Sequence, residues 1–168
     1  MKNVKTIGYA GFTDFASFIA VLKNHNVTDL IDVRSVPRSQ YFTAFNDSNL
    51  QRELPKYGIA YQSFKTEFGA RVENLIYYTN GVVDFEKFAQ SPEFNSGIQK
   101  IEKLIGDNKN ICLMCAEIDP INCHRAILCG RNFAKHNINV EHIIAKRNGE
   151  VIIETQEQVE KRLQSKGG

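Results

Sequence analysis

Short apolar runs that favour β-strands alternate with segments of helical periodicity along most of this chain. Parallel strands need crossover connections, which are usually helical, so this alternation predicts a parallel sheet covered by helices on both faces, a three-layer α/β/α fold. The Asn148-Gly149 pair between two apolar runs is typical of a tight turn, so we expect an antiparallel hairpin at the C-terminal edge of the sheet. The expected strands are residues 4–9, 27–33, 59–64, 110–115, 140–147 and 150–154.

The boundaries of several helices are indicated by capping residues. Thr13 or Asp14 precedes a run with apolar residues at helical spacing, and Ser91 followed by Pro92 is a typical helix start. Asn122 is placed to cap a further helix. The expected helices are residues 15–22, 49–57, 84–90, 91–105 and 123–136, with an irregular, non-periodic stretch at 65–83. We expect one domain over residues 1–155, followed by a polar helix or frayed tail at 156–168.

Composition excludes several classes of protein. The 168 residues are 42% hydrophobic and 24% charged, which is ordinary for a globular domain and excludes a disordered chain. No apolar run approaches the roughly 20 residues of a membrane span, and the first residues lead into no signal-peptide core. Four cysteines without such a signal predict reduced thiols in the cytoplasm. The net charge of +2 requires neither a nucleic-acid nor a membrane partner, and the oligomeric state is open.

Polar residues follow three of the expected strands at the point where each strand ends. The carboxyl ends of parallel strands lie along one edge of a sheet, and ligands bind in the crevice there, so these residues are expected to share one cleft. Tyr9 lies at the end of the first strand, Arg34 follows the second, and Cys115 ends the fourth. The candidates from these three loops are Tyr9, Arg34, Pro37, Arg38, Cys115 and Glu117.

The loop after the fourth strand leads into Cys123-His124-Arg125. If Asn122 caps the helix, these three residues occupy its first turn, where free N–H groups and the helix dipole favour an anion. The same position lowers the pKa of a cysteine and of a histidine, which makes Cys123 a candidate nucleophile and His124 a candidate proton shuttle. The guanidinium of Arg125, with those of Arg34 and Arg38, would then surround an anionic ligand.

Other interpretations of the same residues remain open. Arg34 can pair with Asp32 or Glu117 without any ligand, and the Cys123 segment can be no more than a helix start. Cys112 and Cys129 lie among apolar residues and are expected in the core.

A metal site and a redox pair both involve the same cysteines. Cys115, Cys123 and His124 could supply three metal ligands, yet their spacing is neither Cys-x-x-Cys nor that of a zinc finger. Adjacent residues also point in different directions on a helix, so we predict no metal and no other cofactor. A redox-active Cys115–Cys123 pair stays open, since the loop between them can bring the sulfurs together.

The motifs above resemble an uncharacterised family called domain of unknown function 488. The resemblance rests on residues 6–9, on Asp-Val-Arg-Ser-Val-Pro-Arg-Ser at 32–39, and on Cys115-Ala-Glu with Cys123-His-Arg, and it runs from about Thr6 to Ile144. Glu67-Phe-Gly-Ala-Arg71 is similar to the family's Leu-Gly-Gly-Arg stretch, which adds Arg71 to the candidates. Ala10 departs from the family, whose members carry a polar group there. The resemblance implies a three-layer α/β fold and lends no established activity.

A partial likeness to rhodanese-type sulfurtransferases and cysteine phosphatases gives a second interpretation. Residues 30–34 resemble the rhodanese Asp-Val-Arg strand, and Cys115 ends a strand that leads to Arg125 at a helix start. Nine residues separate Cys115 from Arg125, more than the tight anion loop of those families contains.

These observations predict an enzyme that acts on a phosphate-bearing small molecule or nucleotide. Cys115 or Cys123 would be the nucleophile, and His124 would carry a proton. The alternatives are thiol chemistry of the rhodanese or phosphatase kind and a non-catalytic nucleic-acid-binding module. The last is suggested by residues 34–71, which hold six basic and three acidic side chains.

Overall fold

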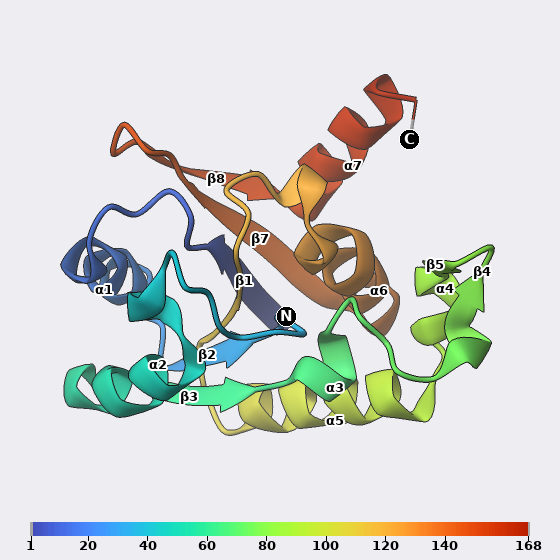
Figure 1. Ribbon diagram of the computed structural model, residues 1–168, viewed down its shortest axis with the longest axis horizontal. Helices are drawn as coiled ribbons and strands as arrows, with labels where there is room; N and C mark the ends of the chain where they lie inside the picture. The colour runs from blue at the N-terminus through green and yellow to red at the C-terminus, as the bar shows by residue number, and fades with distance from the viewer. Residues whose placement is uncertain (1, 168) are drawn as a thin grey trace.

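The computed structural model describes residues 2–167 and contains a six-stranded sheet in the order β3-β2-β6-β1-β7-β8 (Figure 1). The first five strands in that order are parallel, and β8 runs antiparallel to β7. The strands are β1 (Lys2–Gly8), β2 (Asp29–Asp32), β3 (Ala60–Ser63), β6 (Ile111–Cys115), β7 (Ile138–Ala145) and β8 (Val151–Thr155). The predicted α/β class and its antiparallel C-terminal hairpin are confirmed.

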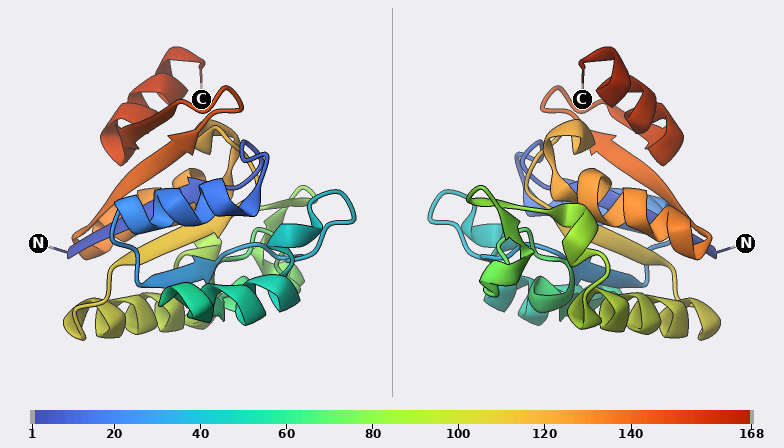
Figure 2. Two further views of the ribbon diagram at one scale, coloured as in Figure 1. Left: turned by 90° about the vertical axis from the view of Figure 1, so that its left-hand side faces the viewer. Right: turned by 90° about the vertical axis from the view of Figure 1, so that its right-hand side faces the viewer.

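Helices cover both faces of this sheet (Figure 2). Two of them begin where their sequences indicate, because Asp14 accepts a hydrogen bond from the backbone N of Ser17 and Ser91 accepts one from that of Phe94. The α-helices are α1 (Phe15–Asn24), α2 (Asp47–Glu53), α3 (Lys65–Phe68), α4 (Phe85–Phe88), α5 (Pro92–Gly106), α6 (Arg131–Phe133) and α7 (Gln156–Ser165). Short 3-10 turns lie at Thr43–Phe45, Leu54–Tyr57, Leu75–Tyr77, Pro120–Asn122 and Ala134–His136.

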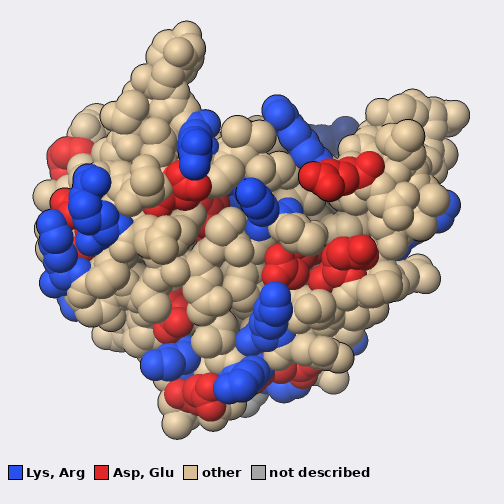
Figure 3. All heavy atoms as spheres, turned by 60° about the horizontal axis from the view of Figure 1, so that its bottom comes forward, with Lys and Arg blue, Asp and Glu red and all other residues tan. Residues whose placement is uncertain are grey.

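The surface formed by α5 and neighbouring elements carries charges of both signs. Lys and Arg side chains alternate with Asp and Glu side chains on this face (Figure 3). The Nζ of Lys100 on α5, for example, lies 2.8 Å from a carboxylate oxygen of Glu67 on α3. This mixture agrees with the small net charge of the chain.

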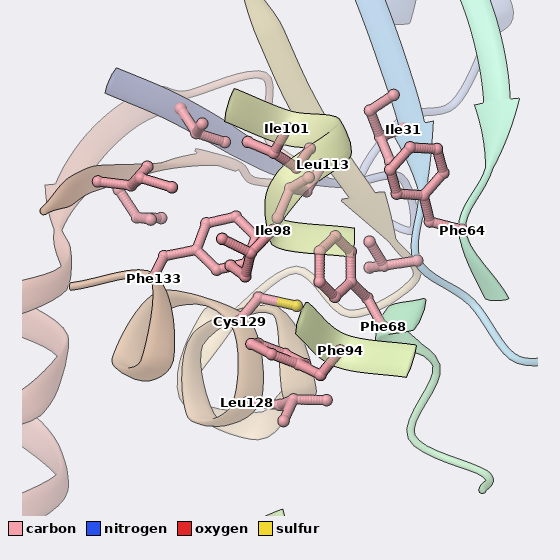
Figure 4. Packing of buried hydrophobic residues seen from close by; sticks show 14 of the residues in the cluster. Ile31, Phe64, Phe68, Phe94, Ile98, Ile101, Leu113, Leu128, Cys129 and Phe133 are labelled. Atoms are coloured by element: carbon pink, nitrogen blue, oxygen red, sulfur yellow. The ribbon is translucent and has the colours of Figure 1, made fainter. Parts of the chain in front are cut away.

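Two apolar cores lie on opposite faces of the sheet. The strand period of two divides the residues of β6 between them, so that Leu113 and Cys115 face one core while Cys112 and Met114 face the other. The first core lies between the strands and the helices α3, α5 and α6, with Cys129 among the aromatic rings (Figure 4). The second lies under α1 and α2.

The stretch at 65–83, predicted to be irregular, contains short elements of regular structure. It holds α3, a 3-10 turn and a small hairpin of β4 (Tyr78–Thr79) and β5 (Val82–Val83). Phe68 is fully buried against α5, where a Cβ on Gly97 would stand 2.6 Å from its ring. The aromatic anchor explains why a segment without clear periodicity is ordered.

The predicted start of the helix at Cys123, capped by Asn122, is wrong. Asn122 ends a 3-10 turn that Asp119 caps by accepting a hydrogen bond from the backbone N of Ile121. Cys123 is then extended, with φ −134° and ψ 141°. Helical structure starts at Arg125 with a π-helical turn, Arg125–Gly130. The chain therefore turns once before Cys123 and begins the helix after it.

The C-terminal residues form a packed helix, one of the two outcomes expected for them. Thr155 and Gln158 make a reciprocal capping box, and Val159 is fully buried. Arg162 holds α7 to the body of the molecule through ion pairs with Asp119 and Glu154. Met1 and Gly168, the ends of the expected domain and tail, lie outside the described residues. None of the helices at 2–167 has the length and apolar character that crossing a bilayer requires.

Candidate active site

The carboxyl ends of β1, β2 and β6 adjoin, because β6 lies between the other two strands. The backbone N of Tyr9 donates to the carbonyl of Cys115 at 3.1 Å, and that of Val33 donates to the carbonyl of Met114 at 3.0 Å. Above β6, the guanidinium carbon of Arg34 lies 5.1 Å from the centre of the Tyr9 ring. Residues from three distant parts of the sequence therefore meet at one edge of the sheet.

Arg34 points into the protein at this edge. Its Nε and Nη2 donate to the two carboxylate oxygens of Asp32 at 2.9 and 2.7 Å, and Nη2 also donates to the carbonyl of Phe45. Both residues of this ion pair are buried, and the Tyr61 hydroxyl donates to Asp32 as well. Burial opposes the charged form, but the hydrogen bond and charge of Asp32 raise the pKa of Arg34 above its ordinary value. Of the interpretations left open by the sequence, pairing of Arg34 with Asp32 is the one seen in the structure.

Arg125 is completely buried, and each of its side-chain nitrogens has a partner in the protein. Nε donates to the Thr6 hydroxyl at 2.9 Å, Nη1 to the carbonyl of Glu117 and to the sulfur of Cys115, and Nη2 to the carbonyl of Ile118. Burial lowers the pKa of Arg125 to about 10, so the group remains charged at neutral pH. Arg125 thus joins β1 to the loop after β6 and brings positive charge to a sulfur atom.

Cys115 and Cys123 are joined as a disulfide, with their Cα atoms 7.6 Å apart. The expectation of four reduced thiols is therefore wrong for these two, because the loop between them folds back over the end of β6. Both are almost fully buried. Cys112 and Cys129 are free and lie in the core as expected, where burial raises the pKa of the Cys112 thiol to about 12.

Polar groups surround the two sulfurs. Nη1 of Arg125 lies 3.3 Å from the sulfur of Cys115, and the backbone N of Arg125 lies 3.5 Å from that of Cys123. The carboxylate of Glu117, an exposed residue, comes within 3.8 Å of the Cys115 sulfur. These N–H donors are of the kind that stabilises a thiolate when the pair is reduced.

His124 lies beside Cys123 with a fixed ring orientation. Its Nε2 is 2.7 Å from the carbonyl of Val33, which can only accept, so Nε2 carries the proton and Nδ1 is left as the acceptor. Nδ1 lies 3.9 Å from the Cys123 sulfur. The pKa of His124 is lowered mainly by burial. The sequence had suggested the N-terminus of a helix as the cause. The imidazole is therefore neutral at pH 7, and its Nδ1 faces the Cys123 sulfur as a potential base.

The remaining candidates lie nearer the surface. The Arg38 side chain is 72% exposed, and its Nε lies 3.2 Å from a carboxylate oxygen of Asp47. The carbonyl of Pro37 accepts a hydrogen bond from the backbone N of Asp47. Arg71 is exposed, and its backbone N donates to the Ser35 hydroxyl. It lines a pocket of about 310 Å³ together with Ser35 and Lys65.

A buried chain of hydrogen bonds, which the sequence did not predict, starts at Arg125. The hydroxyl of Thr6 accepts from Arg125 and lies 2.6 Å from Nδ1 of His142, whose Nε2 lies 2.7 Å from the amide oxygen of Gln156. Burial lowers the pKa of His142 to about 4, which keeps the ring neutral. A signal was present, since Thr6 and His142 are polar residues within apolar strands.

The fold and this edge define an α/β protein with a paired-cysteine centre at the carboxyl ends of parallel strands. A family model matches residues 14–131, and the chain belongs to that family, described as Domain of unknown function DUF488. The match includes the arginine loop at 32–39 and the segment from Cys115 to Arg125, but it leaves out residues 6–9. Comparison with curated proteins and with solved structures gives no match.

Proposed function

We propose that this protein is a cysteine-dependent enzyme whose reactive centre is the Cys115–Cys123 pair, working by thiol–disulfide exchange. The observation that carries the proposal is the direct pairing of two sulfurs from distant ends of one loop, beside a buried guanidinium. Cys112 and Cys129 are also buried, but they are unpaired, and burial raises the pKa of both thiols, which keeps them protonated.

The reaction has two exchange steps. The thiolate of Cys123, after losing its proton to His124, attacks one sulfur of a low-molecular-weight disulfide and expels the first thiolate of that substrate. Cys115, held as a thiolate by Arg125, then attacks the Cys123 sulfur in the mixed disulfide and expels the second. The protein gains its internal disulfide, and the substrate takes up the two electrons and two protons as two free thiols.

The substrate class expected from the sequence, a phosphate-bearing molecule, stays a prediction. Arg125 uses all its side-chain nitrogens within the protein, and the buried Arg34 uses Nε and Nη2, so we expect an anion to depend on the exposed Arg38 and Arg71. The nucleic-acid alternative also stays a prediction. The mixed charges on the face around α5 and β3 do not favour it (Figure 3).

The test is to react the reduced protein with glutathione disulfide and follow the products by mass spectrometry. We expect two glutathione molecules released per chain and a Cys115–Cys123 disulfide. Cys115→Ser should stop at a mixed disulfide on Cys123, and Cys123→Ser should form no internal disulfide. Cys129→Ala removes a free core thiol and leaves the pair intact, so it serves as the control and should react like the wild type. Equal reaction of the wild type and Cys115→Ser would contradict the proposal.

A further inference from the structure

Three potential metal-ligand atoms converge where the two cysteines meet. The sulfurs of Cys115 and Cys123 and a carboxylate oxygen of Glu117 all lie within 4.8 Å of one another. We propose that the reduced form of the pair, together with Glu117, binds a divalent metal ion of the zinc class. The proposal deepens the function proposed above and rests on it in one respect: the pair must exist as a dithiol.

The spacing of the backbone favours a shared ion. The Cα atoms of Cys115 and Cys123 are 7.6 Å apart, whereas those of most disulfides are about 4.4–6.8 Å apart. Zinc–sulfur bonds of about 2.3 Å in tetrahedral geometry hold two thiolates close to 3.8 Å from each other. That separation is wider than the roughly 2.05 Å of a sulfur–sulfur bond, so the wide backbone spacing suits two ligands of one ion.

Charge provides the second argument. Two thiolates and the Glu117 carboxylate bring three negative charges together, and Arg125 beside Cys115 supplies one positive charge. Because both cysteines are buried, the remaining excess of negative charge is costly unless a cation compensates it or the thiols keep their protons. A divalent ion neutralises the excess, and its binding releases the thiol protons to solvent.

The groups behind the sulfurs match those that support metal-bound thiolates. The backbone N and the Nη1 of Arg125 point at the two sulfurs and would orient them as ligands. Soft thiolates select zinc over magnesium or calcium. His124 is not counted as a ligand, because its free ring nitrogen, Nδ1, is not among the atoms that all lie within 4.8 Å of one another. Three protein ligands leave the fourth tetrahedral position for water or a substrate, as in catalytic zinc sites.

Metal binding and disulfide formation then exclude each other. When a low-molecular-weight disulfide takes two electrons from the pair, the two thiolates become a sulfur–sulfur bond and no longer coordinate the ion. The ion is released, and the oxidant leaves as two thiols after taking two protons from solvent. The redox state of the cysteines would therefore control metal occupancy.

Cobalt(II) is a suitable probe because its thiolate complexes absorb light and zinc displaces it. We expect the reduced, metal-free protein to bind one Co²⁺ per chain, with thiolate-to-cobalt absorption in the near ultraviolet that Zn²⁺ abolishes. Cys115→Ser and Cys123→Ser should remove this absorption. Glu117→Gln should weaken binding at least tenfold. Glu150→Gln, an exposed residue on the hairpin loop, is the matched control and should bind as the wild type does.

The outcomes separate this inference from the proposed function. A reduced wild type that reacts with glutathione disulfide but shows no cobalt–thiolate absorption would overturn the metal site alone. Absorption that survives in both cysteine variants, or a Glu117→Gln variant that binds normally, would also overturn it. Cobalt binding without any reaction with glutathione disulfide would overturn the exchange function and leave the metal site. Because Glu117 is exposed, its variant is expected to fold and keeps the test decisive.

Discussion

The guanidinium groups of Arg34 and Arg125 hold the edge of the sheet together from inside. Arg34 joins the end of β2 to Phe45, and Arg125 joins β1 to the loop after β6. Their hydrogen-bond partners are a buried carboxylate, a hydroxyl, carbonyls and a sulfur. An arginine with such partners fixes the surrounding loops, so Arg34 supports the position of Tyr9 and Arg125 that of Cys115.

The buried ion pair predicts a large effect of a small change at Asp32. Asp32→Asn removes the charge that compensates Arg34 and puts an NH₂ donor at one of the oxygens that accept from it. Breaking such a pair at one partner costs about 3–5 kcal/mol. We expect a loss of that order in the free energy of unfolding, measured by urea denaturation.

The matched control is Asp47→Asn, which breaks an ion pair with the largely exposed Arg38. Exposed pairs contribute at most about 1 kcal/mol, so this variant should be nearly as stable as the wild type. Similar losses in the two variants would show that the Asp32–Arg34 pair does not hold the edge of the sheet.

At the scale of elements, one chain of hydrogen bonds connects the cysteine centre to the C-terminal helix. It runs from Arg125 through Thr6 on β1 and His142 on β7 to Gln156, the first residue of α7. Gln156 continues it to the carboxylate of Glu160, which also binds Arg131. Helix α7 is thereby tied to Arg125, although it lies outside the matched family region.

This chain of hydrogen bonds predicts a pH dependence of stability. The pKa of His142 is 6.5 in the unfolded chain and about 4 in the folded protein. Burial is the main cause; Arg125 and Arg162 also disfavour the charged ring, whereas the hydrogen bond with Gln156 and the charge of Glu154 favour it. As pH falls from 6.5 to 4, the unfolded state binds a proton that the folded state refuses, so stability is lost over that window. The loss attributable to this group is at most about 3 kcal/mol.

His142→Gln tests the prediction, since glutamine can bond to Thr6 and Gln156 without titrating. We expect the variant to be less stable at pH 7.5 and to lose less stability than the wild type between pH 6.5 and pH 4 in urea denaturation. Lowered pKa values at His124 and His25 act with the same sign in both proteins and cancel in the comparison. Parallel stability curves would assign the acid sensitivity to other groups.

The element boundaries that could be predicted from the sequence are those set by one local interaction. Ser91 followed by Pro92 starts α5 because a side-chain cap and a fixed φ act within one turn. The start at Arg125 could not be predicted in this way. Asp119 caps a 3-10 turn at Pro120, and this competing turn displaces the helix start past Cys123. Asn122 had the right residue type but was already part of that turn.

At the scale of the whole molecule, strand–helix alternation predicted the sheet and the edge where the polar residues gather. It could not predict the strand order, because any order of parallel strands gives the same local pattern. Nor could it show which way Arg34 and Arg125 point, since their partners include backbone carbonyls that every residue offers. The strand–helix alternation thus predicts that a charged residue lies at the edge of the sheet. Whether its side chain is exposed there depends on tertiary packing, which the alternation does not contain.

The paired cysteines connect the state of the centre to the stability of the whole domain. Closing a loop with a sequence separation of 8 by a disulfide stabilises a protein by about 2–3 kcal/mol in the chain-entropy model, so the oxidised protein should unfold at higher urea than the reduced, metal-free protein. A ligand that binds only the folded state stabilises it by about 2.7 kcal/mol at a hundred times its dissociation constant. Zn²⁺ should therefore raise the stability of the reduced protein by a comparable amount and leave that of the oxidised protein unchanged. Urea denaturation of both forms, with zinc and with a chelator, measures the two effects; equal responses of the two forms to zinc would place its binding away from Cys115 and Cys123.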